Sequence, residues 1–397
     1  MVKESDFLSF STGLPGLDDL LHGLRPGDNV VLQVGSLGEY IPFVKPFVAQ
    51  SVADGHRLIY FRFARHRPLV EACDGVTMCE LHPERGFEGF ISDTIDVIEE
   101  AGRGACYVFD CLSELAVDWY SDRMLGNFFM LACPFLFKLD TIAYFSVYRN
   151  NHSPLAIDAI TDTAQVVATV YRNKQRLYVQ PLKVDQRHSP TMYALNEWNE
   201  GRFTPITNSA VTAAILTRTP QPWLDFTIHR PEVWMRTFAE AQEALADLRE
   251  GKVKASSLGS LHNRLIRMAV TRQEKLAGLA RRYLSLPRLM GILQRMIGTG
   301  LIGGKSLGML LARAILEESD AAWTDKLEPH DSFFIGSDVF YTYLVQNDCW
   351  WLRRRRPGTP LDTVLANAAQ AREKILVGEF PQDIRHQFME MLEYFGQ

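Results

Sequence analysis

Five apolar runs rich in β-branched and aromatic residues recur through the first half of the chain and constrain its fold more than any other feature. They are "NVVLQVG" (29–35), "RLIYFRF" (57–63), "ACYVFDCL" (105–112), "IAYFSVYR" (142–149) and "AQVVATVYR" (164–172). Segments long enough for helices lie between them, such as "YIPFVKPFVAQSVADG" and "FEGFISDTIDVIEEAG". Because such apolar strands need cover on both faces, this alternation predicts an α/β fold with a parallel sheet flanked by helices.

The pattern changes after the last of these runs. Residues 175–206, "QRLYVQPLKVDQRHSPTMYALNEWNEGRFTPI", alternate apolar and polar side chains, with turn residues in between. Alternation at period two is typical of strands that bury only one face. We therefore expect antiparallel strands at one edge of the sheet.

The second half of the chain reads as helices followed by a mixed region. "PEVWMRTFAEAQEALADLREGK" and "SLGSLHNRLIRMAVTRQEKLAGLARRYL" place apolar residues at helical spacing. Such a stripe is usually a core face, and a helical hairpin that forms a homo-oligomer is the alternative. Since a chain of 397 residues exceeds the size of one core, we expect two or more domains, the first of them over 1–215. The resemblances given below imply the further bounds, a helical linker region 216–294 and an α+β region 295–397.

Composition excludes several classes of function. The formal net charge of -5 provides no general attraction for nucleic acid or for an anionic membrane surface. No run approaches the roughly 18 apolar residues that a spanning helix requires. The six cysteines form no C-x-x-C pair, so we expect neither a metal site nor disulfides, but reduced thiols in a cytoplasmic protein.

The first apolar run leads into "VGSLGEYIPF", which has glycines where a phosphate-binding loop would have them. Such a loop, G-x-x-x-x-G-K-[ST], uses backbone N–H groups and the Lys to bind phosphates and the hydroxyl to bind Mg²⁺. Gly35 and Gly38 are present. If Gly35 is the first glycine of the pattern, however, Ile41 takes the place of the lysine and Pro42 that of the hydroxyl.

Asp110 follows the third apolar run, in "VFDCLSEL". The carboxyl end of a parallel strand is where an α/β sheet binds its ligand and where a Walker B aspartate lies. Aspartates at strand ends also cap the next helix. From position alone, both roles remain open for Asp110.

The opening "STGLPGLDDLLHGLRPGDNVVLQVGS" resembles the start of the RecA-like ATPases related to the circadian-clock protein KaiC. The order of features also matches over residues 9–208. The resemblance implies a RecA-like sheet and places Asp110 on the Walker B strand. It also aligns the late stretch that contains Lys183, Arg187, His188 and Ser189 with the K-x-R-x-S-x-H-S segment of that family.

This chain departs from that family at the positions that carry the chemistry. Besides Ile41 and Pro42, Ala64 and Arg65 stand in the region where the family has acidic residues that polarise the attacking water. Without the cation, the Mg²⁺ ligand and the carboxylate, phosphoryl transfer loses its electrostatic stabilisation. We therefore predict a RecA-like domain that neither hydrolyses ATP nor binds it tightly. The alternative is that Lys45 reaches back to a phosphate.

A second glycine-containing segment, "MIGTGLIGGKSLGMLLARAILEE" (296–318), offers another place for an anion. Gly303 and Gly304 permit close approach of a ligand to the backbone, and Lys305 opens a helix with one apolar face. Glycines before a helix are also ordinary turn chemistry. Spacing alone leaves both interpretations open.

"LIGGKSLGMLLARAIL" is similar to the opening of the ATP-binding region of phosphoenolpyruvate synthase and pyruvate phosphate dikinase. The similarity continues through "DSFFIGSDVFYTYLVQN" and "FPQDIRHQFMEMLEYFG", and so covers about residues 295–397. It implies a partial ATP-grasp-like region in which Lys305 contacts the phosphates of ATP, Gly303 and Gly304 form the turn around them, and Mg²⁺ accompanies the nucleotide.

The family's later segments are not in this sequence: the "V-R-S-S" strand, acidic metal ligands, a phosphorylatable histidine and a pyruvate-binding barrel. We therefore assign no catalytic residue and expect no complete phosphotransfer cycle from this polypeptide. The favoured interpretation is the N-terminal part of a phosphoenolpyruvate-synthase-like protein, with the remaining domains or another protein as partner. The alternatives are a non-enzymatic interaction or regulatory module and an active RecA-like ATPase or kinase.

Overall fold

The computed structural model describes residues 10–187, 190–217, 233–328, 331–353 and 359–396. The chain forms two compact units, each described by itself below. The first comprises Met1–Asp118 and Phe128–Arg230, and the second comprises Trp119–Asn127 and Pro231–Gln397. The polypeptide therefore passes from the first unit into the second and back before its long C-terminal segment begins.

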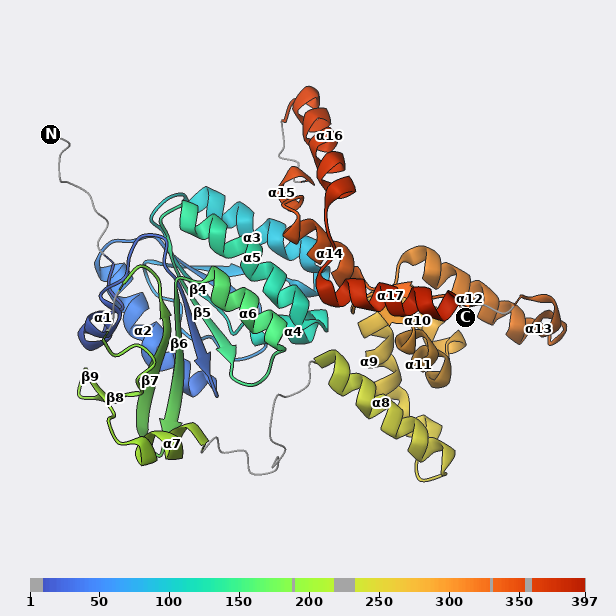
Figure 1. The fold of residues 1–397 in the computed structure, drawn as a ribbon, viewed down its shortest axis with the longest axis horizontal. Helices are drawn as coiled ribbons and strands as arrows, with labels where there is room; N and C mark the ends of the chain where they lie inside the picture. Colours follow the sequence, from blue (N-terminus) through green and yellow to red (C-terminus); the bar gives the residue numbers. More distant parts are fainter. Residues whose placement is uncertain (1–9, 188–189, 218–232, 329–330, 354–358, 397) are drawn as a thin grey trace. The chain divides into compact units, whose positions relative to one another are not determined.

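A mostly parallel sheet forms the centre of the first unit (Figure 1). Among the described residues it has nine strands in the order β3-β2-β4-β5-β1-β6-β7-β8-β9, parallel from β3 to β6 and antiparallel from β6 to β9. The strands are β1 (Asn29–Val34), β2 (Leu58–Arg62), β3 (Val76–Glu80), β4 (Cys106–Phe109), β5 (Ile142–Tyr148), β6 (Val166–Asn173), β7 (Arg176–Val184), β8 (Asn196–Asn199) and β9 (Arg202–Pro205). This confirms the α/β class, the five predicted parallel strands and the antiparallel edge.

Helices cover both faces of this sheet, as its apolar strands require. In Figure 1, α1 and α2 lie on one face, and α3 to α6 lie on the other. The helices are α1 (Pro15–Leu21), α2 (Leu37–Ala53), α3 (Phe87–Ala101), α4 (Ser113–Trp119), α5 (Asp122–Lys138), α6 (Pro154–Thr163) and α7 (Ser209–Thr217).

The strand alternation supplies a separate core for each face. Val30 and Leu32 of β1 belong to the cluster that includes Phe43 of α2. On the other face, the ring of Phe109 on β4 meets that of Phe128 on α5, with 6.0 Å between centroids. Successive strand residues point to opposite faces, so both layers stabilise the same sheet.

The "STG" tripeptide, residues 11–13, forms a turn that precedes α1. Asp18 accepts hydrogen bonds from the Ser11 hydroxyl at 2.5 Å and from the Thr12 N–H at 2.8 Å. Gly13 has a φ of +73°, and a Cβ there would lie 2.2 Å from the carbonyl oxygen of Pro46. This segment of the KaiC resemblance therefore has a structural role.

The second unit is built of helices with a small parallel pair of strands. Its strands are β10 (Met296–Ile297) and β11 (Phe334–Ile335). Its helices are α8 (Val233–Arg249), α9 (Gly259–Leu265), α10 (Glu274–Tyr283), α11 (Leu286–Gln294), α12 (Gly304–Ser319), α13 (Ala322–Lys326), α14 (Ser337–Gln346), α15 (Trp350–Arg353), α16 (Leu361–Val377) and α17 (Gln382–Gly396). In the described part of both units, no helix has the length and apolar character needed to cross a membrane.

One hydrophobic core extends across the boundary expected at residue 294. It contains Trp234 of α8 and Leu289 of α11 together with Leu307 of α12 and Phe334 of β11. Residues from α8 to α12 and β11 thus share a core, and the described residues of the expected linker region, from 233 to 294, pack as part of the second unit.

Candidate functional site

The topology of the first unit favours a ligand at the end of β1. Open α/β sheets bind ligands at the carboxyl ends of neighbouring strands whose connections leave in opposite directions. Here the chain leaves β1 through α2 toward β2, and it leaves β5 through α6 across β1 toward β6. α2 and α6 lie on opposite faces (Figure 1). The favoured place is therefore at the carboxyl ends of β1 and β5.

An internal ion pair occupies that place. The N–H of Gly35, just after β1, donates to Oε2 of Glu39 at 2.6 Å. Nη2 of Arg149, just after β5, lies 3.3 Å from the same oxygen, and the two side chains are only 8% and 10% exposed. In a phosphate-binding loop, backbone N–H groups face the phosphate. The Glu39 carboxylate takes the position of such an anion.

The residues compared with the phosphate loop lie mostly within a helix. Only Gly35 and Ser36 separate β1 from α2, and Gly38 is in the first turn of α2. Ile41 and Pro42 both lie inside α2, and the side chain of Ile41 packs against the core. A two-residue turn leaves too few free N–H groups to surround a triphosphate.

Pro42 makes a further change to this helix. A proline inside a helix deprives the carbonyl four residues earlier of its usual N–H donor. That carbonyl belongs to Gly38, and Nη2 of Arg172 donates to it at 2.7 Å. The start of α2 is thus stabilised by an arginine from the end of β6.

We expect Gly35→Ala to destabilise the first unit by about 1–3 kcal/mol, the usual cost of overpacking, because the hydrogen bond from Arg149 to the Val170 carbonyl keeps its guanidinium from moving aside. A Cβ at Gly35 would lie 2.5 Å from Nη2 of Arg149. Gly38→Ala is the matched control, since its Cβ would meet only the Ser36 hydroxyl at 3.6 Å and alanine favours a helix. Urea denaturation of both variants measures the difference. Equal losses at the two glycines would contradict this account of the turn.

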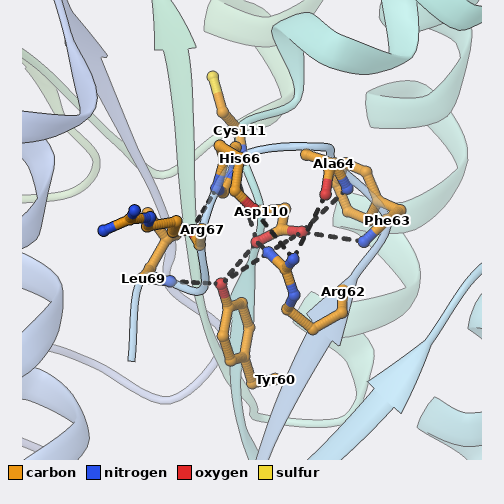
Figure 2. Close-up of polar contacts among 9 residues, drawn as sticks. All are labelled: Tyr60, Arg62, Phe63, Ala64, His66, Arg67, Leu69, Asp110 and Cys111. Carbon is orange, nitrogen blue, oxygen red and sulfur yellow. Dashed lines mark hydrogen bonds and ion pairs between the residues drawn. The ribbon is translucent and has the colours of Figure 1, made fainter. Parts of the chain in front are cut away.

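Asp110, the candidate Walker B residue, is fully buried and surrounded by donors (Figure 2). Nη1 of Arg62 lies 2.7 Å from both carboxylate oxygens. The N–H groups of Phe63 and Ala64 donate to Oδ2 at 2.9 and 3.0 Å, and the Tyr60 hydroxyl donates to Oδ1 at 2.5 Å. These contacts join the residues at the end of β2 to Asp110, which directly follows β4.

Three further side chains lie around Asp110: His66, Tyr60 and Cys111. Nε2 of His66 accepts from the N–H of Cys111 at 3.3 Å, and its Nδ1 lies 2.7 Å from the carbonyl oxygen of Arg67. Since a carbonyl oxygen only accepts, Nδ1 is the donor in this contact. Burial, followed by the Asp110 carboxylate, raises the pKa of Tyr60 well above its ordinary value. Burial raises the pKa of Cys111 to about 11, so its thiol stays protonated at neutral pH.

This geometry gives Asp110 a structural role. A metal-binding aspartate must direct an oxygen toward the metal, but both oxygens here accept bonds from the end of β2. Arg65, where the resembling family has acidic residues, is exposed and lies 3.6 Å from Asp118. Among the described residues, no group of three or more His, Cys, Asp or Glu could hold a metal ion.

Sequence analysis misses a buried serine–histidine pair beside this site. Oγ of Ser113 lies 2.6 Å from Nε2 of His152, and the N–H of Tyr148 donates to the same hydroxyl at 2.8 Å. Ser113 and His152 are 1% and 3% exposed. The pair is buried, and it joins the start of α4 to the loop after β5. The residues are 39 positions apart and have no motif that would reveal the contact.

The late stretch shared with the KaiC-like family also makes internal contacts. Nζ of Lys183 donates to the carbonyl of Thr161 at 2.8 Å. Arg187 forms a buried ion pair with Asp28 at 2.9 Å. His188 and Ser189 lie outside the described residues. The two cations that are described therefore bind the chain itself.

The Gly-Gly-Lys segment of the second unit begins α12, as its sequence predicts. Gly303 precedes the helix with extended backbone, and Lys305 is exposed. A Cβ at Gly303 or Gly304 would meet nothing within 4 Å. The left-handed glycines are instead Gly298 and Gly300, with φ of +71° and +88°. Close backbone approach is therefore a property of the preceding turn.

That preceding turn surrounds the buried carboxylate of Asp338. The N–H and hydroxyl of Thr299 donate to its two oxygens, each at 2.7 Å. Nε of Arg123 lies 3.5 Å from Oδ2. Burial raises the pKa of Asp338 above its ordinary value, although these donors act in the opposite direction. As in the first unit, an internal carboxylate occupies the glycine-containing turn.

No family model matches this chain, and no curated protein is significantly similar to it in sequence. The fold and the side-chain contacts therefore carry the functional inference.

Proposed function

We propose that this chain is a regulatory module whose first unit is a RecA-like, KaiC-like domain without ATPase activity. The observation that carries the proposal is the Glu39 carboxylate, bonded to the Gly35 N–H and paired with Arg149 at the end of β1. In an active relative, the phosphates and their metal would occupy this position. Here the chain supplies the anion itself.

Electrostatics oppose nucleotide binding at this position. A phosphate placed against the Gly35 N–H would also face the Glu39 carboxylate. Two like charges 4 Å apart repel by about 4 kcal/mol at the effective dielectric constant of a protein surface. No cation compensates from the expected lysine position, because Ile41 packs against the core there. The residues of the first unit therefore do not fit Mg·ATP.

Asp110 supports the same conclusion from the neighbouring strands. Its charge is balanced by Arg62 at 2.7 Å, and its lone pairs accept the Phe63 and Ala64 N–H groups. Direct coordination of Mg²⁺ would require these donors to be displaced. A domain whose strand ends are held together by internal contacts suits the binding of a partner on a fixed surface better than repeated binding and hydrolysis of ATP.

A second candidate function is ATP binding at the start of α12, as in phosphoenolpyruvate synthase and pyruvate phosphate dikinase. The favouring observation is that Gly303, Gly304 and Lys305 are all exposed at the N-terminus of a helix of 16 residues. Helix N-termini attract phosphate, and Lys305 would add a cation. Bound ATP would supply a phosphoryl group, and further domains or a partner protein would have to complete the site.

Titration calorimetry of the full chain with Mg·ATP tests both proposals. We expect no sub-millimolar binding in the first unit, and we expect any heat of binding to vanish in Lys305→Ala. Lys45→Ala is the matched control, because Lys45 is an exposed lysine of α2. Sub-millimolar affinity that is lost in Lys45→Ala and kept in Lys305→Ala would place the nucleotide in the first unit and refute the proposal.

A further inference from the structure

We propose that Gly35 and Arg149 form an oxyanion site that the Glu39 side chain keeps closed, and that truncating this side chain opens the site to a small oxyanion such as inorganic phosphate. The inference rests on the proposed function, because it treats Glu39 as the substitute for a ligand. The inference is tested by phosphate binding to a variant, and the proposed function by Mg·ATP binding to the natural chain, so the two can fail separately.

Arg149 is built to hold an anion. Its side chain is nine-tenths buried, its Nη1 donates to the carbonyl of Val170 at 2.5 Å, and its guanidinium lies 4.3 Å from the ring centroid of Tyr171. These contacts fix the guanidinium but do not neutralise it. Within the described part of the chain its Nε is buried without a hydrogen-bond partner, and its Nη2 contacts the Glu39 carboxylate.

The contacts of Gly35 show how closely the groups converge. An atom placed at the Cβ position of Gly35 would lie 2.5 Å from Nη2 of Arg149 and 3.2 and 3.3 Å from the two oxygens of Glu39. Gly35 and the next residue, Ser36, are exposed. A small anion from solvent therefore has access to the turn once the carboxylate is gone.

Arg172 adds a second cation at the same turn of α2. It is exposed, and its Nη2 donates to the carbonyl of Gly38, three residues after Gly35. Pro42 leaves this carbonyl without a helical donor. Without Glu39, the start of α2 would keep Arg149 and Arg172 and lose its internal anion.

The test compares Glu39→Ala, Glu39→Gln and the natural chain in thermal unfolding, with inorganic phosphate against sodium chloride at equal ionic strength. We expect phosphate to raise the melting temperature of Glu39→Ala in a saturable way, with an affinity at least about tenfold above that of the natural chain. Glu39→Gln should show no gain, because its amide fills the same space and its oxygen accepts the Gly35 N–H.

Each outcome decides the inference. Equal responses of Glu39→Ala to phosphate and chloride would overturn it, and so would an equal gain in Glu39→Gln, which would indicate general charge effects. Loss of the phosphate response in Glu39→Ala with Arg149→Ala would support it. Should Glu39→Ala fail to fold in chloride, recovery of its circular dichroism in phosphate supports the site, and absence of recovery contradicts it. Tight binding of Mg·ATP in the first unit of the natural chain would instead refute the proposed function.

Discussion

Replacing Asp110 with alanine is expected to destabilise the first unit by about 3–5 kcal/mol, the usual cost of removing one partner of a buried ion pair. The change would leave the largely buried guanidinium of Arg62 without its carboxylate, and the N–H groups of Phe63 and Ala64 without an acceptor. Hydrogen exchange measured by mass spectrometry should show faster exchange at Phe63 and Ala64, together with a lower urea midpoint.

Glu80→Ala is the matched control, because Glu80 is an exposed carboxylate at the end of the neighbouring strand β3. We expect its urea midpoint to stay within the small range of surface substitutions, about 0.5 kcal/mol. An aspartate that served only to hold a metal would leave the fold intact when replaced. Unchanged protection at Phe63 in Asp110→Ala would therefore contradict the structural role assigned here.

Replacing Asp338 with alanine should cost the second unit about 1–3 kcal/mol, the usual cost of leaving a buried donor without an acceptor. Asp338 is 1% exposed, accepts both donors of Thr299 and lies beside Arg123. Its loss leaves the N–H of Thr299 without its acceptor at the turn that contains Gly298 and Gly300, while Arg123 keeps its ion pair with Asp383. Exchange at residues 298–301 should accelerate more than exchange in α10, which lies in the same unit.

Asp338→Asn separates the two contributions to this loss. Its amide oxygen still accepts the N–H of Thr299, while the charge opposite Arg123 disappears. Since burial already raises the pKa of Asp338, the neutral side chain avoids the cost of burying a charge. We expect a smaller loss than for alanine in urea denaturation. An equal loss in both variants would show that the ion pair, and not the turn, determines the stability.

The sequence predicts the elements of the first unit well where burial is complete. β1 and β5 lie within apolar runs that only a doubly covered sheet can bury, so their pattern is decisive. β3 is absent from the prediction because "VTMCE" is largely half-buried or exposed and lacks such a run. The helical stripe of α8 predicts an apolar face but not the elements that cover it, which include residues on both sides of position 294.

The sequence reveals which phosphate-binding groups the candidate site lacks, but it does not reveal which group takes the place of the phosphate. The absence of a lysine and hydroxyl at Ile41 and Pro42 is visible in the sequence and predicts weak nucleotide binding. The replacement of phosphate by Glu39 is not, because it depends on the register of β1 and β5. Val34 pairs with Tyr148 in that register, so the residues that follow them, Gly35 and Arg149, become neighbours.

Trp119–Asn127 belongs to the second unit, although it lies between two stretches of the first unit in the sequence. This arrangement limits how the chain can be divided, in its gene and in experiments. Neither unit corresponds to one uninterrupted stretch of gene, so the halves cannot be recombined as independent cassettes. A fragment that ended at residue 215 would carry Arg123 without Asp338, and buried Asn127 without the Thr342 hydroxyl that it contacts at 2.9 Å. Such a fragment would expose orphaned polar groups that its own residues cannot satisfy.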